Sequence, residues 1–325
     1  MQRALVTGLA GQDGSFLADL LLAEGVEVHG TVRRGAPADA GAHPRLARHR
    51  GDPRLVLHPV ELEDRAAVRA LVAEIGPDEL YHLTGTRKPV DSVAAGEALL
   101  EGAIGTTHAL ASALHAARPG AGFFFAASSE LFAPDAPSPC DERTPFDPRS
   151  VYAIAKAAGV GLVRHYRERG LRAAAGILFN HESARRGPGY VTRAISAGAA
   201  RVALGLAREV ALGDLDARRD WGHARSFARA MTLMIRRDAP EDLVLATGAA
   251  HTVRDFAAAA FAHVGLDWRR HVVVDPAIPR PPRPGLVGNP ARAAELLGWR
   301  DDVPFERLVA EMVDDDLETL RRRER

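Results

Sequence analysis

Cysteine is almost absent. The single residue, Cys140, cannot form an internal disulfide, and no group of Cys and His residues has zinc-site spacing. The 42 Lys and Arg residues equal the 42 Asp and Glu residues in number, so the net charge does not indicate a nucleic acid or an acidic membrane as partner. No apolar run approaches the roughly 20 residues that span a bilayer, and no charged leader opens the chain. We therefore expect a cytoplasmic protein without a metal site, nucleic-acid partner or membrane anchor.

Lysine is the other scarce residue. Only Lys88 and Lys156 are lysines, and every other one of the 42 Lys and Arg residues is an arginine. The chain thus uses arginine wherever any positive charge suffices. A retained lysine indicates a specific role, because the compact ammonium and the planar guanidinium are not interchangeable.

Short apolar segments alternate with amphipathic ones through the first 180 residues. Residues 3–8, 26–32, 54–60, 79–83, 122–127 and 173–179 are predicted strands. Residues 12–24, 65–75, 98–117 and 150–169 are predicted helices. This alternation predicts an α/β fold with a Rossmann-type, doubly wound parallel sheet.

The pattern loosens after Asn180, and residues 276–290 are too rich in proline for regular structure. Residues 242–247 still have strand character and are expected to return to the first sheet. We therefore predict an NADP-binding Rossmann domain of residues 1–180 plus about 222–255. Residues 181–221 and 256–325 are expected to form a smaller C-terminal α/β lobe that binds the substrate.

The first predicted strand runs into a glycine-rich loop and then a helix. Gly8, Gly11 and Gly14 have GxxGxxG spacing, with Gln12 and Asp13 between the last two glycines. Such glycines permit a tight turn and let a pyrophosphate approach the helix N-terminus. Between the first strand and first helix of a βαβ unit, the pattern indicates a dinucleotide site.

The second predicted strand ends in two arginines, Arg33 and Arg34. An NAD site usually has an acidic residue at this position, which binds the ribose hydroxyl, whereas arginine suits a 2′-phosphate. The sequence therefore favours NADP as cofactor.

Four polar residues form the candidate catalytic group. Tyr152 and Lys156 are four apart and share one face of a predicted helix, where the ammonium can stabilise a phenolate. Ser128 ends the fifth strand, where its hydroxyl can bind the substrate hydroxyl that Tyr152 deprotonates. Glu130 adds a carboxylate. Simple dehydrogenation does not need this group, but removal of a proton beside a ketone does need such a base.

Several longer motifs extend these signals along nearly the whole chain. They are GQDGS (11–15), SSELF (128–132), VYAIAK (151–156), NHES (180–183), RDWG (219–222) and GNPARAAELLGW (288–299). Together they resemble the GDP-mannose 4,6-dehydratases, which belong to the extended short-chain dehydrogenases. The resemblance implies NADP as cofactor, a GDP-sugar substrate and a homodimer or homotetramer.

The resemblance also implies residue roles. Tyr152 matches the base that oxidises C4, with Lys156 as its partner, Ser128 as the hydroxyl, and Glu130 as the C5 base and C6 acid. The positions implied for cofactor binding are Gly8, Gly11, Gln12, Asp13, Gly14, Arg33, Arg34, Glu61, Leu83, Tyr152 and Lys156. Those implied for substrate binding are Ser129, Asn180, Arg219 and Arg280.

Departures from the family pattern fall mainly where substrate is expected. They include Arg87, Lys88, Ala194 and Arg283. The sequence therefore predicts a 4,6-dehydratase but leaves open which sugar is used. An epimerase or 4-reductase acting on a related GDP-sugar remains an alternative, as does a catalytically silent NADP-sensing protein.

Overall fold

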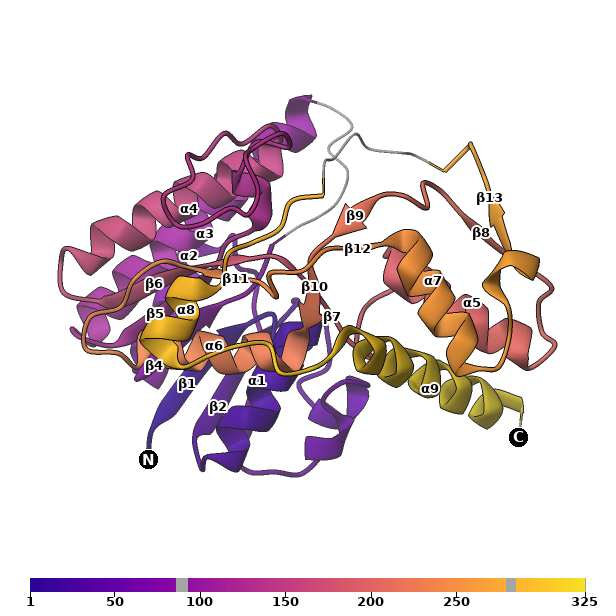
Figure 1. Cartoon of the computed structure of the whole chain (residues 1–325). Coiled ribbons are helices and arrows are strands. Elements are labelled where there is room, and N and C mark those ends of the chain that lie inside the picture. Colours follow the sequence, from indigo (N-terminus) through magenta and orange to yellow (C-terminus); the bar gives the residue numbers. More distant parts are fainter. Residues whose placement is uncertain (86–92, 279–284, 325) are drawn as a thin grey trace.

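The computed structural model describes residues 1–85, 93–278 and 285–324, and its centre is a parallel sheet with the strand order β11-β6-β5-β4-β1-β2-β3 (Figure 1). The strands are β1 (Arg3–Thr7), β2 (Glu27–Val32), β3 (Leu55–Pro59), β4 (Glu79–His82), β5 (Gly122–Ala126), β6 (Arg172–Leu178) and β11 (Leu243–Leu245). Every neighbouring pair is parallel. The predicted Rossmann-type sheet is confirmed, including the return of residues 242–247 as its edge strand.

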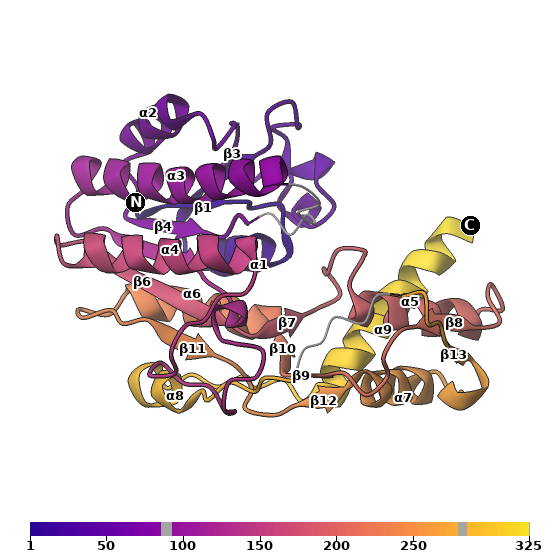
Figure 2. The same cartoon turned by 90° about the horizontal axis from the view of Figure 1, so that it is seen from above.

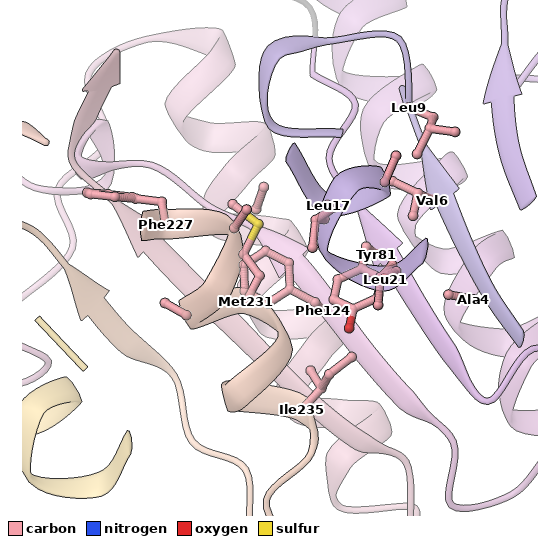
Figure 3. Packing of buried hydrophobic residues seen from close by; sticks show 14 of the residues in the cluster. Ala4, Val6, Leu9, Leu17, Leu21, Tyr81, Phe124, Phe227, Met231 and Ile235 are labelled. Carbon is pink, nitrogen blue, oxygen red and sulfur yellow. The ribbon is translucent and has the colours of Figure 1, made fainter. Parts of the chain in front are cut away.

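Helices cover both faces of the sheet, which is why its strands are almost wholly apolar. They are α1 (Gln12–Ala23), α2 (Arg65–Ile75), α3 (Val93–Ala117), α4 (Val151–Arg167), α6 (Ala224–Ile235) and α8 (Ala291–Leu297). Helices α1 and α6 pack on one face, while α2, α3 and α4 pack on the other (Figure 2). On the α1–α6 side, Leu17 and Leu21 meet Met231, Ile235 and the sheet residue Phe124 in one buried cluster (Figure 3).

A smaller lobe lies beyond the carboxyl ends of the strands. Its helices are α5 (Val191–Ala203), α7 (Val253–His263) and α9 (Phe305–Glu324), which enclose a third apolar cluster (Figure 2). In this cluster Trp221 packs edge-to-face on Phe256 with ring centroids 5.5 Å apart. The sequence predicts a smaller α/β lobe in this part of the chain, and these elements form one.

Short strand pairs and 3₁₀ turns complete the described part. The strands are β7 (Asn180–Glu182), β8 (Val210–Leu212), β9 (Arg218–Arg219), β10 (Trp221–His223), β12 (His251–Thr252) and β13 (Val272–Val274). They pair as β7–β10, β8–β13 and β9–β12. The 3₁₀ turns are η1 (Ala40–Ala42), η2 (Ala47–His49), η3 (Ser129–Leu131) and η4 (Trp268–Arg270). Across these described residues, no helix is both long and apolar enough to cross a bilayer.

Helix α3 begins at Val93, five residues before the predicted start at residue 98. Its first turn is exposed, with Val93 80% accessible, so it has no apolar stripe of the kind that marks a helix in sequence. The alanines and glutamate there nevertheless favour a helix by intrinsic propensity.

The strand order reverses between β1 and β4, and this reversal places the site. In open α/β sheets, ligands bind in the crevice beyond the carboxyl ends of the strands at such a switch point. The glycine-rich loop follows β1, Leu83 follows β4, and Ser128 comes soon after β5. Residues predicted from separate motifs therefore come together at one edge of the sheet.

Candidate active site

A cavity of about 300 Å³ opens at this edge of the sheet. Its lining contains Asp13, Leu83, Ser128, Ser129, Tyr152, Lys156 and Asn180, all of them predicted from the sequence. These residues come from α1 and α4, from the segments directly after β4 and β5, and from the start of β7. The structure thus joins these seven candidates for cofactor binding, catalysis and substrate binding in one cavity, while their individual roles stay predictions.

The glycine-rich loop has the shape that a dinucleotide site requires. Gly8 has a φ of +72°, a conformation that glycine adopts readily. Gly14 lies in the first turn of α1, and a Cβ on it would be only 2.6 Å from the Cα of Leu9. Helix α1 can therefore pack closely on the loop only with glycine at this position. Helix α1 begins after Gly11, which has no side chain to cap its first backbone N–H groups. A pyrophosphate fits this helix N-terminus.

Tyr152 and Lys156 lie in the first turns of α4. This helix begins where the hydroxyl of Ser150 accepts a hydrogen bond from the Ala153 amide at 3.1 Å. The Lys156 ammonium is buried and donates to the carbonyl oxygen of Ala126 at 2.7 Å. It lies 5.7 Å from the centre of the Tyr152 ring. The cation is therefore anchored to the end of β5 and held beside the tyrosine.

The Ser128–Glu130 segment is shaped by a short turn. Ser128 is buried, and its hydroxyl accepts a hydrogen bond from the Glu130 amide at 3.2 Å, which caps η3. The turn brings Ser129 into the cavity wall. Glu130 follows directly and is half-buried. Ser128 and Ser129 thus belong to the cavity wall, whereas Glu130, the next residue in the chain, is not among the described residues that line the cavity.

A buried histidine beneath Lys156 was not predicted. His82 Nε2 is 3.2 Å from the Thr107 hydroxyl, which itself donates to Ala103 O, and His82 Nδ1 is 2.9 Å from the Thr7 hydroxyl. This pattern fits a neutral ring that donates through Nε2 and accepts through Nδ1. Burial and the charge of Lys156 lower the pKa of His82 to about 3. His82 therefore adds no second cation beside Lys156.

Three more cavity-lining residues, His181, Arg186 and Tyr190, were also missed. The signal for one of them was available, because His181 lies in the NHES motif, of which only Asn180 was assigned a role. Arg186 lies over the Tyr190 ring, 3.5 Å from its centre, and its Nε is 3.0 Å from a carboxylate oxygen of buried Glu182. The cavity wall therefore has a cation that the motif spacing did not reveal.

The predicted cofactor-phosphate residues lie at the end of β2. Arg33 and Arg34 are both exposed, and Arg34 forms a 3.4 Å ion pair with Asp64. The neighbouring carboxyl of Glu63 raises the pKa of Glu61, while the charges of Arg34 and Arg33 act in the opposite direction. The two arginines and Glu61 thus form one exposed group, and their contacts with the cofactor stay predictions.

The other positions that the sequence connects with the substrate are spread over several parts of the chain. Arg219 lies in β9, opposite His251 of β12, and is not among the described residues that line this cavity. Ala194 is an exposed residue of α5. Four further positions lie outside the described residues, namely Arg87, Lys88, Arg280 and Arg283. Within the described ranges, no group of three or more His, Cys, Asp or Glu residues is arranged to hold a metal ion.

This sheet, glycine-rich loop and Tyr–Lys pair define a dinucleotide-binding protein of the extended short-chain dehydrogenase type. The fold is similar to that of RMD from Pseudomonas aeruginosa, solved in complex with NADPH, with a TM-score of 0.81 and 21% identity over 98% of this chain and 100% of that chain. The family model described as GDP-mannose 4,6 dehydratase matches residues 5–312. The chain therefore belongs to the GDP-mannose 4,6 dehydratase family.

Curated relatives extend this match across kingdoms. GDP-mannose 4,6 dehydratase 1 of Arabidopsis thaliana is 40% identical over 330 residues, which cover 98% of this chain and 91% of the relative. GDP-mannose 4,6 dehydratase of Homo sapiens is 39% identical over 344 residues, covering 98% of this chain and 92% of the relative. The similarity therefore includes the small lobe as well as the sheet.

Proposed function

We propose that this chain is a lyase that converts GDP-mannose, or a related GDP-sugar, to the 4-keto-6-deoxy sugar with NADP as cofactor. The observation that carries the proposal is the cavity in which Ser128, Tyr152 and Lys156 meet, in a chain of this family. The family membership supports the GDP-sugar substrate, and the two arginines after β2 support NADP.

The glycine-rich loop would hold the cofactor pyrophosphate through the N-terminus of α1. Arg33 and Arg34 would bind the 2′-phosphate, with Glu61 near the adenine and Leu83 in the cavity wall. The bound cofactor would supply the hydride chemistry, in its oxidised form as acceptor of the hydride from sugar C4 and in its reduced form as donor of that hydride to C6. Lys156 would orient the ribose hydroxyls while its charge stabilises the Tyr152 phenolate.

The protein side chains would carry the proton transfers. Tyr152 removes the proton of the C4 hydroxyl while the Ser128 hydroxyl holds the same oxygen by a hydrogen bond. The resulting C4 ketone makes the C5 proton acidic, and Glu130 removes it. Glu130 then protonates the C6 hydroxyl, which leaves as water, and C5 takes a proton from the solvent when the hydride returns to C6. One carboxylate thus serves as base and then as acid, as an elimination between neighbouring carbons requires.

The small lobe would bind the substrate. We propose that Ser129, Asn180, Arg219 and Arg280 hold the sugar and the nucleotide diphosphate, because guanidinium groups suit phosphate oxygens. In the proposed domain assignment, residues 1–180 plus about 222–255 bind the cofactor and residues 181–221 plus 256–325 form the substrate lobe, while Ser129 and Asn180 of the cofactor domain complete the substrate site. The resemblance also supports a homodimer or homotetramer in the cytoplasm.

The direct test is incubation of the purified protein with NADP⁺ and a panel of GDP-sugars, followed by mass analysis of the products. We expect a product lighter than GDP-mannose by one water and no net consumption of NADP⁺. An isobaric product would instead identify an epimerase. Unchanged substrate throughout the panel would contradict an enzymatic role for these sugars.

Cofactor choice gives a second expected result. NADP⁺ should bind at least about tenfold more tightly than NAD⁺, which corresponds to about 1.4 kcal/mol. Arg34→Ala should weaken NADP⁺ binding and leave NAD⁺ binding nearly unchanged, because only NADP⁺ has the 2′-phosphate that the guanidinium binds. Calorimetric titration with both cofactors measures the difference.

A matched control for Arg34→Ala is Arg69→Ala, which removes an exposed arginine from α2. This control should leave both affinities unchanged. Equal affinities for the two cofactors in the unaltered protein would show that Arg33 and Arg34 do not bind the 2′-phosphate.

A further inference from the structure

The glycine-rich loop is tied to the segment that follows β6 by a set of hydrogen bonds. The Gln12 amide donates to His181 O at 3.0 Å, and its oxygen accepts from the Ser183 hydroxyl at 2.9 Å. Next to these, His181 Nε2 is 3.1 Å from a carboxylate oxygen of Asp13. Asp13 and His181 both line the cavity. The Asp13–His181 pair therefore links the segment expected to bind the cofactor to β7 in the cavity wall.

Both ring nitrogens of His181 face groups that can only accept. Nδ1 is 2.7 Å from the carbonyl oxygen of Phe179, and Nε2 faces the Asp13 carboxylate. A neutral imidazole has only one N–H, so both hydrogen bonds can form only if the ring is an imidazolium. The ring also stacks on Phe227 of α6 with centroids 4.7 Å apart, which fixes its plane.

From this geometry we propose that Asp13 is a positioning residue that holds His181 as an imidazolium in the cavity wall, where its charge attracts the diphosphate of a bound ligand. The proposal rests on the proposed function, because it takes the cavity as the site of a dinucleotide and a nucleotide sugar. Both ligands contain a diphosphate, and the experiment below separates them.

The charged groups around His181 agree with this assignment. Burial alone would lower the pKa of His181, but the charge and hydrogen bond of Asp13, from α1, outweigh it and raise that pKa. Arg186, from the segment after β7, acts in the opposite direction and is itself paired with Glu182. Burial likewise would raise the pKa of Asp13, yet His181 lowers it to about 2. The directions of both pKa shifts therefore favour the ionised pair, as the hydrogen-bond geometry does.

The sign of the pH dependence follows from these shifts. Because the folded-state pKa of His181 is raised, its positive charge is fully present at low pH and is lost as pH rises through that pKa. Diphosphate affinity should therefore fall on the alkaline side. Removing the Asp13 charge should move this fall to lower pH, because an opposite charge within hydrogen-bond distance shifts a pKa by about 1–3 pH units.

The experiment compares the unaltered protein with Asp13→Asn, which keeps the side-chain shape but removes the charge. Histidine-labelled protein is titrated by NMR without ligand, and His181→Gln identifies the signal. We expect the His181 midpoint to fall by at least about 1 pH unit in Asp13→Asn. Affinities for NADP⁺ and for GDP are then measured across the same pH range. The ligand whose diphosphate faces His181 should lose affinity at lower pH in the variant.

Below both midpoints, the variant should bind that ligand at least as tightly as the unaltered protein, because His181 is then charged in both and the variant lacks the Asp13 carboxylate that opposes an anion. This recovery separates a charge effect from a merely structural one. A matched control is Asp314→Asn, which removes the carboxylate 2.7 Å from His263 in the small lobe. It should leave the His181 midpoint and both affinity profiles unchanged.

Two results would overturn the proposal. One is an unchanged His181 midpoint in Asp13→Asn, and the other is an affinity loss of equal size at every pH for both ligands. The NMR titration needs neither substrate nor turnover. A protein that shows the shifted midpoint but forms no dehydrated sugar would therefore contradict the proposed function and leave the Asp13–His181 assignment standing.

Discussion

Tyr152→Phe is expected to lower turnover by about a hundredfold or more, the scale of general acid–base catalysis. The substitution removes the oxygen that accepts the C4 hydroxyl proton and keeps the ring. Because oxidation at C4 comes first in the proposed sequence, every later step should stop with it. Product formation from GDP-mannose, followed by mass analysis, measures the loss.

The structure provides a matched control on the same helix. Tyr166 is a buried residue of α4 that packs beside α3 rather than in the cavity lining, so Tyr166→Phe removes a hydroxyl of the same kind. It should retain most of the turnover, while NADP⁺ affinity should change little in either variant. Near-full turnover of Tyr152→Phe would show that another group is the base.

The sheet could be predicted from sequence because its strands are short and buried on both faces. The FFF run of β5 and the AAAGIL run of β6 are apolar throughout, and turns or charged helix faces separate such runs. The start of α3 could not be predicted, since its exposed first turn has no apolar stripe. Local pattern thus reveals elements that are buried and misses those stabilised mainly by propensity.

The residues of the candidate site can be divided in the same way, into those that a local sequence pattern reveals and those that it misses. Tyr152 and Lys156 are four residues apart, and the glycines lie within one loop, so spacing alone indicates them. Asp13 and His181 are 168 residues apart in the chain. Their pairing depends on how the segment after β6 lies against the glycine-rich loop, which no local pattern specifies. His82 was missed because its hydroxyl partners Thr7 and Thr107 come from β1 and α3, which are far from it in the sequence.

Glu130 decides between a dehydratase and the alternatives, because only an elimination needs a carboxylate beside C5 and C6. Glu130→Gln keeps the size and hydrogen-bonding capacity of the side chain but cannot accept the C5 proton. Water loss should therefore fall by about a hundredfold or more. Oxidation at C4 does not depend on this carboxylate, so near-ultraviolet absorbance of the reduced cofactor should build up in the variant.

Solvent deuterium gives an independent measurement of the same step. In the unaltered protein, C5 of the product should carry deuterium from the solvent, because the proton that Glu130 removes leaves with the C6 oxygen as water and C5 must take a new proton from the solvent. In Glu130→Gln, the little sugar that reacts should contain scarcely any. Asp135→Asn, which alters an exposed carboxylate five residues further along, should behave like the unaltered protein. Normal dehydration by Glu130→Gln would mean that the half-buried Glu130 carboxylate has no catalytic role, and that the base for C5 must be a residue of the cavity lining.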